Sequence, residues 1–108
     1  HLSEARYYAY LSSVYTYKLA LDKGRFMSYG KKLFDSIERA MKLDSKDALV
    51  LSMKGNVEFY SPFGNKKKAL EYFQQADSLY AVSAIEYEQW NRRAVEMNIQ
   101  QCVEKLNK

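Results

Sequence analysis

"LSMKGNVEFYSPFGNKKKALEYFQQA", residues 51–76, decides the fold because it repeats one helical pattern on both sides of a break. Apolar and small residues recur there at intervals of three and four, the spacing of one face of an α-helix. Pro62 has no backbone donor and biases Ser61 away from helical geometry. Gly64 permits a positive φ, and Asn65 can cap a following helix. One interrupted helix or a basic anion-binding loop would also fit, but we favour two antiparallel helices joined by a five-residue loop.

Size and composition favour a single helical domain. The 108 residues are 47% hydrophobic and 28% charged, with one Pro and four Gly. These are ordinary globular values, and so few turn residues suit helices better than many short strands. The ten tyrosines suit half-buried seams between helices, or else a recognition surface, where tyrosine is also enriched. We therefore expect an all-α fold.

Apolar periodicity predicts five helical segments. They cover about 3–22, 28–43, 46–60, 66–80 and 84–107. Asp44 or Ser45 is expected to cap the third segment, with Asp47 in its first turn. Ser83 and Glu86 form a capping-box pattern at the start of the fifth. The fifth carries the apolar stripe Tyr87, Trp90, Ala94, Val95, Ile99, Cys102, Val103 and Leu106.

The order of small and aromatic residues resembles the tetratricopeptide repeat. The first helix of residues 51–76 carries Leu51, Lys54–Gly55 and Phe59, and the second carries Ala69, Phe73 and Ala76 at the spacings of four and three typical of that family. Leu33, Ile37 and Ala40 repeat the second-helix spacing upstream, after Tyr8, Leu11, Ser12 and Tyr15. Departures are Lys54 where the family has Leu, and extra residues in the first unit.

This resemblance implies a short right-handed α-solenoid of antiparallel helix hairpins, with five helices in one domain spanning 1–108. The first repeat would cover about 4–47, the second about 48–83, and a terminal capping helix about 84–107. A small side chain lets two helices approach, and the aromatic fills the space beside it. Each helix pair needs its neighbours to cover its apolar face, so the domain could belong to a longer protein.

Catalytic and metal-binding motifs are not evident. His1 is the sole histidine, so a Ser or Cys nucleophile has no credible base, and Cys102 is the sole cysteine. We expect no enzyme activity, no metal and no cofactor. No apolar run approaches the roughly 20 residues that span a bilayer. The chain starts at His1, as a mature form, a tag remnant or a piece of a longer protein would, and its compartment stays open.

The resemblance also implies a concave groove and its contact residues. Asn56, in "GNVEF", matches the Gly-Asn-aromatic pattern of family members that grip a peptide's terminal carboxylate, and Arg92 falls at the corresponding place in the last helix. Ser52 stands where such a clamp has lysine, so the clamp is incomplete. With Phe59 and Tyr60 these residues predict a groove for a peptide or partner surface, hence a protein-protein interaction module or scaffold. The competing hypothesis buries Phe59 and Tyr60 beneath the fifth helix.

A basic surface is the alternative. The net charge is +4, and Lys66, Lys67 and Lys68 form a compact run at a helix start, where phosphate or sulfate could bind. With Lys23, Arg25, Lys31 and Lys32, this run could make a basic helical domain that binds nucleic acid or an anionic surface. No reader motif accompanies the run, so nucleic acid is not favoured. Self-association through the terminal helix or loops is a further expectation, and the partner's identity stays open.

Overall fold

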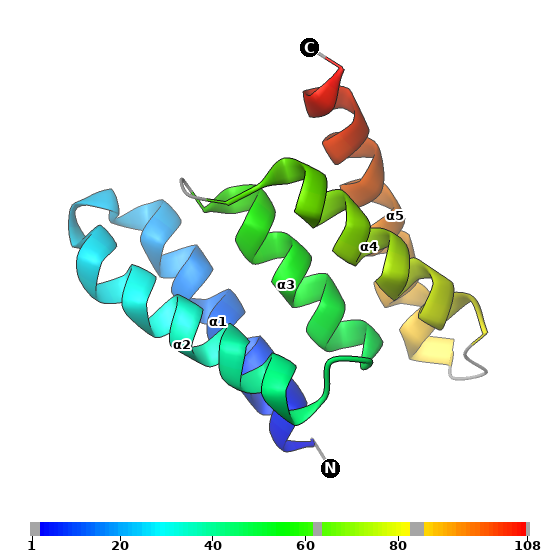
Figure 1. The fold of residues 1–108 in the computed structure, drawn as a ribbon, viewed down its shortest axis with the longest axis horizontal. Coiled ribbons are helices and arrows are strands. Elements are labelled where there is room, and N and C mark those ends of the chain that lie inside the picture. The colour runs from blue at the N-terminus through cyan, green and yellow to red at the C-terminus, as the bar shows by residue number, and fades with distance from the viewer. Residues whose placement is uncertain (1–2, 62–63, 83–85, 108) are drawn as a thin grey trace.

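The computed structural model describes residues 3–61, 64–82 and 86–107, and these residues form five α-helices and no strand (Figure 1). The predicted all-α class is confirmed. A 3₁₀ turn, η1 (Lys23–Arg25), links the first two helices. The helices are α1 Glu4–Leu21, α2 Phe26–Leu43, α3 Ala48–Tyr60, α4 Lys66–Ala81 and α5 Glu86–Leu106.

The N-terminus of α3 corrects one sequence-based expectation. Its cap is Asp47, whose Oδ1 accepts hydrogen bonds from the backbone N–H groups of Leu49 (2.9 Å) and Val50 (3.2 Å). Asp44 instead accepts from the N–H of Lys46 (3.0 Å) and closes the preceding turn. Asn65 caps α4 as expected, through Lys68 N–H (3.1 Å). The capping box predicted at Ser83 lies outside the described residues.

Asp47 also holds the start of α3 against α1. The Nε of Arg6 donates to both of its carboxylate oxygens, at 3.2 and 3.0 Å, and both side chains are mostly buried. The carboxylate of Asp47 therefore both caps α3 and forms a partly buried, charge-assisted hydrogen-bonded pair with Arg6. This interaction joins residues 41 positions apart, so local sequence pattern cannot reveal it.

Asp47→Ala is expected to lower the free energy of unfolding by about 2 kcal/mol, because a lost cap costs about 1 and the broken pair a similar amount. Asp44→Ala is the matched control, since Asp44 holds one exposed turn and its loss is expected to cost well under 1 kcal/mol. Urea denaturation followed by circular dichroism measures both. Equal effects of the two substitutions would refute the assignment of Asp47 as the cap.

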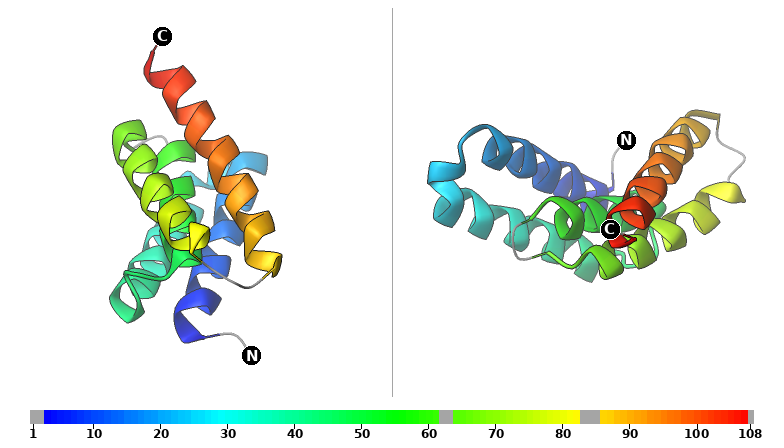
Figure 2. Two further views of the ribbon diagram at one scale, coloured as in Figure 1. Left: turned by 90° about the vertical axis from the view of Figure 1, so that its right-hand side faces the viewer. Right: turned by 90° about the horizontal axis from the view of Figure 1, so that it is seen from above.

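The helices pack mainly on their neighbours in the chain. α1 packs on α2, α3 on α4, and α4 on α5, while α3 also contacts α1, α2 and α5. Seen from above in Figure 2 (right), α3 lies between α1 and α5, and α2 and α4 lie on the lower side of the picture. The molecule measures 42 × 39 × 21 Å. The odd-numbered helices thus share one face of a flat molecule.

Two buried clusters make up the core. The first lies between α1, α2 and α3 and includes Leu33, Ile37, Val50 and Val57. The second lies between α3, α4 and α5 and includes Phe73, Ala76, Tyr80, Val95 and Cys102. The side chains on both sides of α3 therefore join two halves into one compact body.

The close approach of α3 and α4 depends on Gly55. A Cβ added there would lie 2.6–2.9 Å from three atoms of the Phe73 ring. Ala69, Phe73 and Ala76 are all buried, as the sequence spacing predicted. Gly64 has no positive φ, but an added Cβ would overlap the carbonyl group of Glu58. Glycine is therefore required at both positions because there is no room for a side chain.

Candidate functional site

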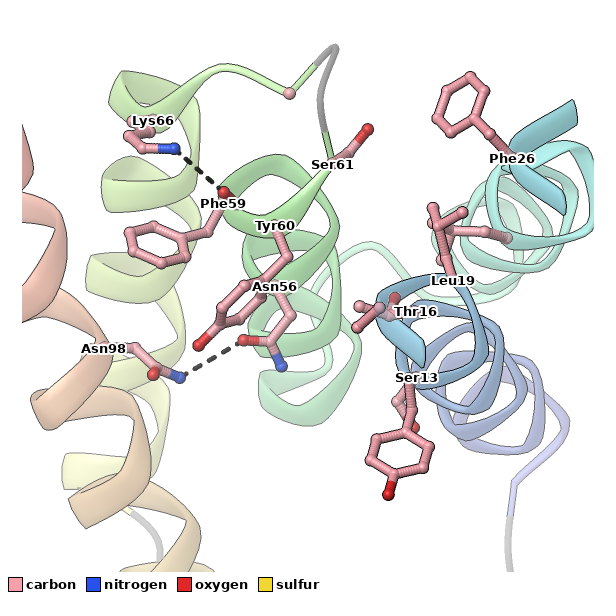
Figure 3. A pocket seen from close by; sticks show the side chains of 14 residues that line it. Ser13, Thr16, Leu19, Phe26, Asn56, Phe59, Tyr60, Ser61, Lys66 and Asn98 are labelled. Atoms are coloured by element: carbon pink, nitrogen blue, oxygen red, sulfur yellow. Dashed lines mark hydrogen bonds between the residues drawn. The ribbon is translucent and has the colours of Figure 1, made fainter. Parts of the chain in front are cut away.

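A cavity of about 1070 Å³ opens between α1, α3 and α5, on the face that these three helices share (Figure 3). It is the candidate site because its walls mix hydroxyl, amide and aromatic groups, as ligand pockets do. Its lining consists of Ser13, Thr16, Tyr17, Leu19, Ala20, Phe26, Leu33, Asn56, Phe59, Tyr60, Ser61, Gly64, Lys66 and Asn98.

The α1 wall presents two hydroxyl groups and one exposed tyrosine. Ser13 Oγ donates to the carbonyl of Tyr10 (2.7 Å), and Thr16 Oγ1 donates to the carbonyl of Ser12 (3.0 Å). These bonds use the hydroxyl hydrogens, so each oxygen can still accept a hydrogen bond. Tyr17 is largely exposed beside them. This wall is uncharged and offers hydrogen-bond acceptors next to an aromatic ring.

The α3 wall carries an amide and two aromatic rings that contact each other. Phe59 and Tyr60 contact edge to face, with centroids 4.8 Å apart. One turn earlier on the same face lies Asn56 (Figure 3). Phe59 is partly buried, whereas Tyr60 is exposed, so the hypothesis that both rings lie buried beneath the last helix does not hold for Tyr60.

A pair of amides bridges α3 and α5 across the cavity. Asn98 Nδ2 donates to Asn56 Oδ1 at 3.5 Å, and Asn56 Nδ2 lies 3.7 Å from Met53 Sδ. Both contacts are at the long end of their ranges and are therefore weak. Each amide has two N–H donors and one carbonyl acceptor, so the pair can exchange these contacts for stronger ones with a peptide backbone.

Lys66 closes the rim of the cavity by folding onto the end of α3. Its Nζ donates to the carbonyl of Phe59 (3.2 Å) and lies 4.9 Å from the centre of that ring. A cation at the last turn of a helix complements its dipole and satisfies a terminal carbonyl. Lys67 and Lys68 are exposed and do not line the cavity.

The turn before α4 already supplies partners for its own donors. Asn65 N–H donates to Glu58 Oε2 (2.8 Å), and Lys68 N–H donates to the Asn65 side chain. The Lys54 ammonium also approaches Glu58 (3.4 Å). A carboxylate therefore already accepts from the N–H of the residue that caps α4. The anion contact at Lys66, Lys67 and Lys68 stays a prediction.

Two other predicted groove residues lie elsewhere. Ser52 is buried, and its hydroxyl donates to the carbonyl of Leu49 (2.8 Å). Arg92 Nε contacts Asp77 Oδ1 and Glu96 Oε1, both at 3.0 Å, and the hydrogen bond with Asp77 raises the pKa of Arg92. Neither side chain lines the cavity, whereas Asn56, Phe59 and Tyr60 do.

Asn98 is the cavity residue of α5 that the sequence reasoning missed, and Tyr17 on α1 was missed as well. Asn98 lies three residues after Val95 and four before Cys102, both buried, so helical spacing sets it at the edge of the packed face of α5. An asparagine at the edge of an apolar helix face is the sequence feature that could have predicted this residue. The resemblance instead pointed to Arg92, six residues earlier.

The thiol of Cys102 is enclosed in the second core cluster. It is fully buried, and burial raises its pKa, an effect that the charge of Lys66 partly offsets. A raised pKa lowers the thiolate fraction and hence its reactivity at neutral pH. Within the described residues, no three His, Cys, Asp or Glu side chains come together as metal ligands. No described helix combines the length and apolarity needed to cross a membrane.

Compared with known proteins, the chain matches no family model, no curated protein and no solved structure at a significant level.

Proposed function

We propose that the five helices form a short right-handed α-solenoid of the tetratricopeptide type, in which α1–α2 and α3–α4 are antiparallel hairpins and α5 is a terminal capping helix. The succession of helix contacts along the chain supports this arrangement. So does the packing of Phe73 on Gly55, the small-and-aromatic pair that carried the resemblance. The odd-numbered helices would then be the inner helices, and their shared face the concave one.

We further propose that the domain is a protein-protein interaction module that binds a peptide segment of a partner in this cavity. The observation that carries the proposal is the lining: Asn56 and Asn98 present amides in the same cavity as the exposed Tyr17 and Tyr60. Amides can both donate to and accept from a peptide backbone, and tyrosine rings bind side chains with little loss of conformational entropy. Lys66 is the one charged residue among the described lining residues, which favours a largely uncharged ligand.

A basic surface for nucleic acid or anionic lipid remains the alternative, with less support. Several of its cations contact the chain itself: Lys66 binds the end of α3, and Lys32 lies 5.7 Å from the centre of the Tyr15 ring. Retention on an immobilised polyanion that falls steeply with salt would favour this alternative. Peptide binding with weak salt dependence favours the interaction module.

Selection from a library of random linear peptides tests the proposal. We expect enriched sequences to bind with micromolar dissociation constants, and Asn56→Ala to weaken binding about fivefold to tenfold, the equivalent of one hydrogen bond. Asn107→Ala is the matched control because Asn107 is exposed just after α5, outside the cavity. Isothermal titration calorimetry measures the affinities. Failure to enrich any peptide, or equal affinities of both variants, would refute the proposed site.

A further inference from the structure

The outward face of α1 is apolar along its whole length. Five residues form it, between 40% and 70% exposed, and we name them the α1 stripe: Tyr7, Tyr10, Val14, Tyr17 and Leu21. They follow one another at intervals of three, four, three and four, so they lie on one side of the helix. Ala5, Ala9, Ser12 and Leu19 are buried on the opposite side.

A helix that is apolar on both sides normally has both sides covered. The helix at the other end of the molecule, α5, differs in this respect. Its outward row, opposite the buried Val95 and Cys102, consists of exposed Arg93, Met97, Gln100 and Glu104. Three of these four residues are polar, as expected of a helix face that contacts water. The α1 stripe is therefore an uncovered packing surface.

The spacing of the stripe fits another α-helix. Alternating intervals of three and four average 3.5 residues, the repeat by which the seam of a two-helix coiled coil is recognised. In that pattern Tyr7, Val14 and Leu21 take one set of core positions, and Tyr10 and Tyr17 the other. A helix with the same pattern can interdigitate with it, and α1 of a second copy has this pattern.

Charges beside the stripe favour an antiparallel pairing of two copies of α1. Glu4 and Lys18 flank the same side of the stripe, 14 residues apart, and both are exposed. The Lys18 Nζ lies 5.7 Å from the centre of the Tyr15 ring, at the surface, and turns away from that ring to reach a carboxylate of a second copy. In an antiparallel pair, flanking residues of one side meet each other, so Glu4 of each copy meets Lys18 of the other. Arg6, on the other flank, is bound to Asp47 and would face the uncharged Ala20. A parallel pair would instead set Lys18 beside Ser13, without an opposite charge.

We propose that the chain forms a homodimer through the α1 stripe, with the two α1 helices antiparallel and Tyr10 of each copy packed on Val14 of the other. The dimer uses a different surface from the cavity, with Tyr17 alone belonging to both. Because one helix per copy supplies most of the contact, the interface is smaller than the standard 20–30 residues a side, and we expect micromolar affinity.

Sedimentation velocity from low to high micromolar concentrations tests the dimer. We expect the mass to rise toward twice 12.7 kDa. Val14→Glu is expected to weaken association at least tenfold, because it buries a charge at the centre of the seam. Val103→Glu is the matched control and is expected to leave association unchanged. Val103 on α5 is 41% exposed and Val14 on α1 is 47% exposed, and glutamate is a good helix former at both positions.

A charge exchange tests the antiparallel alignment while leaving the stripe intact. Lys18→Glu is expected to weaken the dimer severalfold by opposing two carboxylates, and Glu4→Lys combined with Lys18→Glu is expected to restore it. Circular dichroism melting establishes that each variant is folded. A wild type that stays monomeric throughout, or binds a different protein through the stripe as a monomer, overturns the proposal. So does a dimer that Val14→Glu leaves unchanged.

Discussion

Phe73→Ala is expected to lower the free energy of unfolding by about 4 kcal/mol, since truncating a buried phenylalanine typically costs 3–5 kcal/mol. Phe73 is 1% exposed, and its ring fills the space above Gly55. Its helical neighbours Ala69 and Ala76 are too small to collapse into the resulting cavity. The loss is a large part of the 5–15 kcal/mol typical of a domain this size.

Tyr60→Ala is the control for Phe73→Ala. Tyr60 is also an aromatic residue, but it is 57% exposed, so its removal is expected to cost about 1 kcal/mol or less, mainly from its contact with Phe59. Urea denaturation measures both variants. A cost below 1 kcal/mol for Phe73→Ala would show that α4 does not pack on α3 through this ring.

Gly55→Leu is expected to destabilise the protein by about 3 kcal/mol, the upper end of the usual cost of overpacking. Leucine has a higher intrinsic helix propensity than glycine, and this difference alone would stabilise the protein by up to about 1 kcal/mol. The steric term dominates, because even a Cβ would lie 2.6 Å from the enclosed Phe73 ring. The helices must separate or the ring must move.

Alanine at two helical glycines supplies the matched comparison. At Gly30 an added Cβ would meet only the Phe26 ring, at 3.8 Å, an ordinary contact. Gly30→Ala is therefore expected to raise the free energy of unfolding by about 0.5–1 kcal/mol, whereas Gly55→Ala lowers it. In a Phe73→Ala background, Gly55→Leu is expected to lose most of its cost. The packing of Phe73 on Gly55 would be contradicted if both alanine substitutions changed the free energy of unfolding in the same direction. It would also be contradicted if Gly55→Leu cost as much in the Phe73→Ala background as in the wild type.

Local pattern predicted much of the fold because the relevant interactions are local. The spacing of Ala69, Phe73 and Ala76 predicted the buried face of α4, and Asn65 its cap. The cap of α3 was missed because Asp44, Ser45 and Asp47 could each accept the capping hydrogen bonds. The ion pair with the distant Arg6 holds Asp47 in this position.

The stripe predicted for α5 was only partly right. Val95 and Cys102 are buried, but Ala94, Val103 and Leu106 are exposed. Ala94 and Val103 each lie beside a buried residue but at the margin of the packed face, and the C-terminal end of α5 extends beyond α4 (Figure 1). The side chains of Tyr87 and Trp90 lie outside the described part of the chain. Periodicity identifies the apolar face of a helix but not the length over which a neighbour covers it.

The residues that line the cavity were predicted only in part. Asn56, Phe59 and Tyr60 lie on it, as the tetratricopeptide-like order suggested. Arg92 does not, because Asp77 on α4 holds its guanidinium at 3.0 Å. Asn98 takes part instead, through a contact with a residue 42 positions away. Which polar residue of α5 reaches the groove depends on how α5 is rotated on α4, and sequence spacing does not fix that rotation.

The most direct test of the proposed binding mode is isotope-filtered nuclear magnetic resonance of the labelled domain with an unlabelled peptide from the selection. We predict intermolecular nuclear Overhauser effects from the peptide to the side chains of Asn56, Tyr60 and Asn98, which α3 and α5 contribute to one cavity. Effects confined to α2, or to the outward face of α4, would show that the peptide does not bind in this cavity.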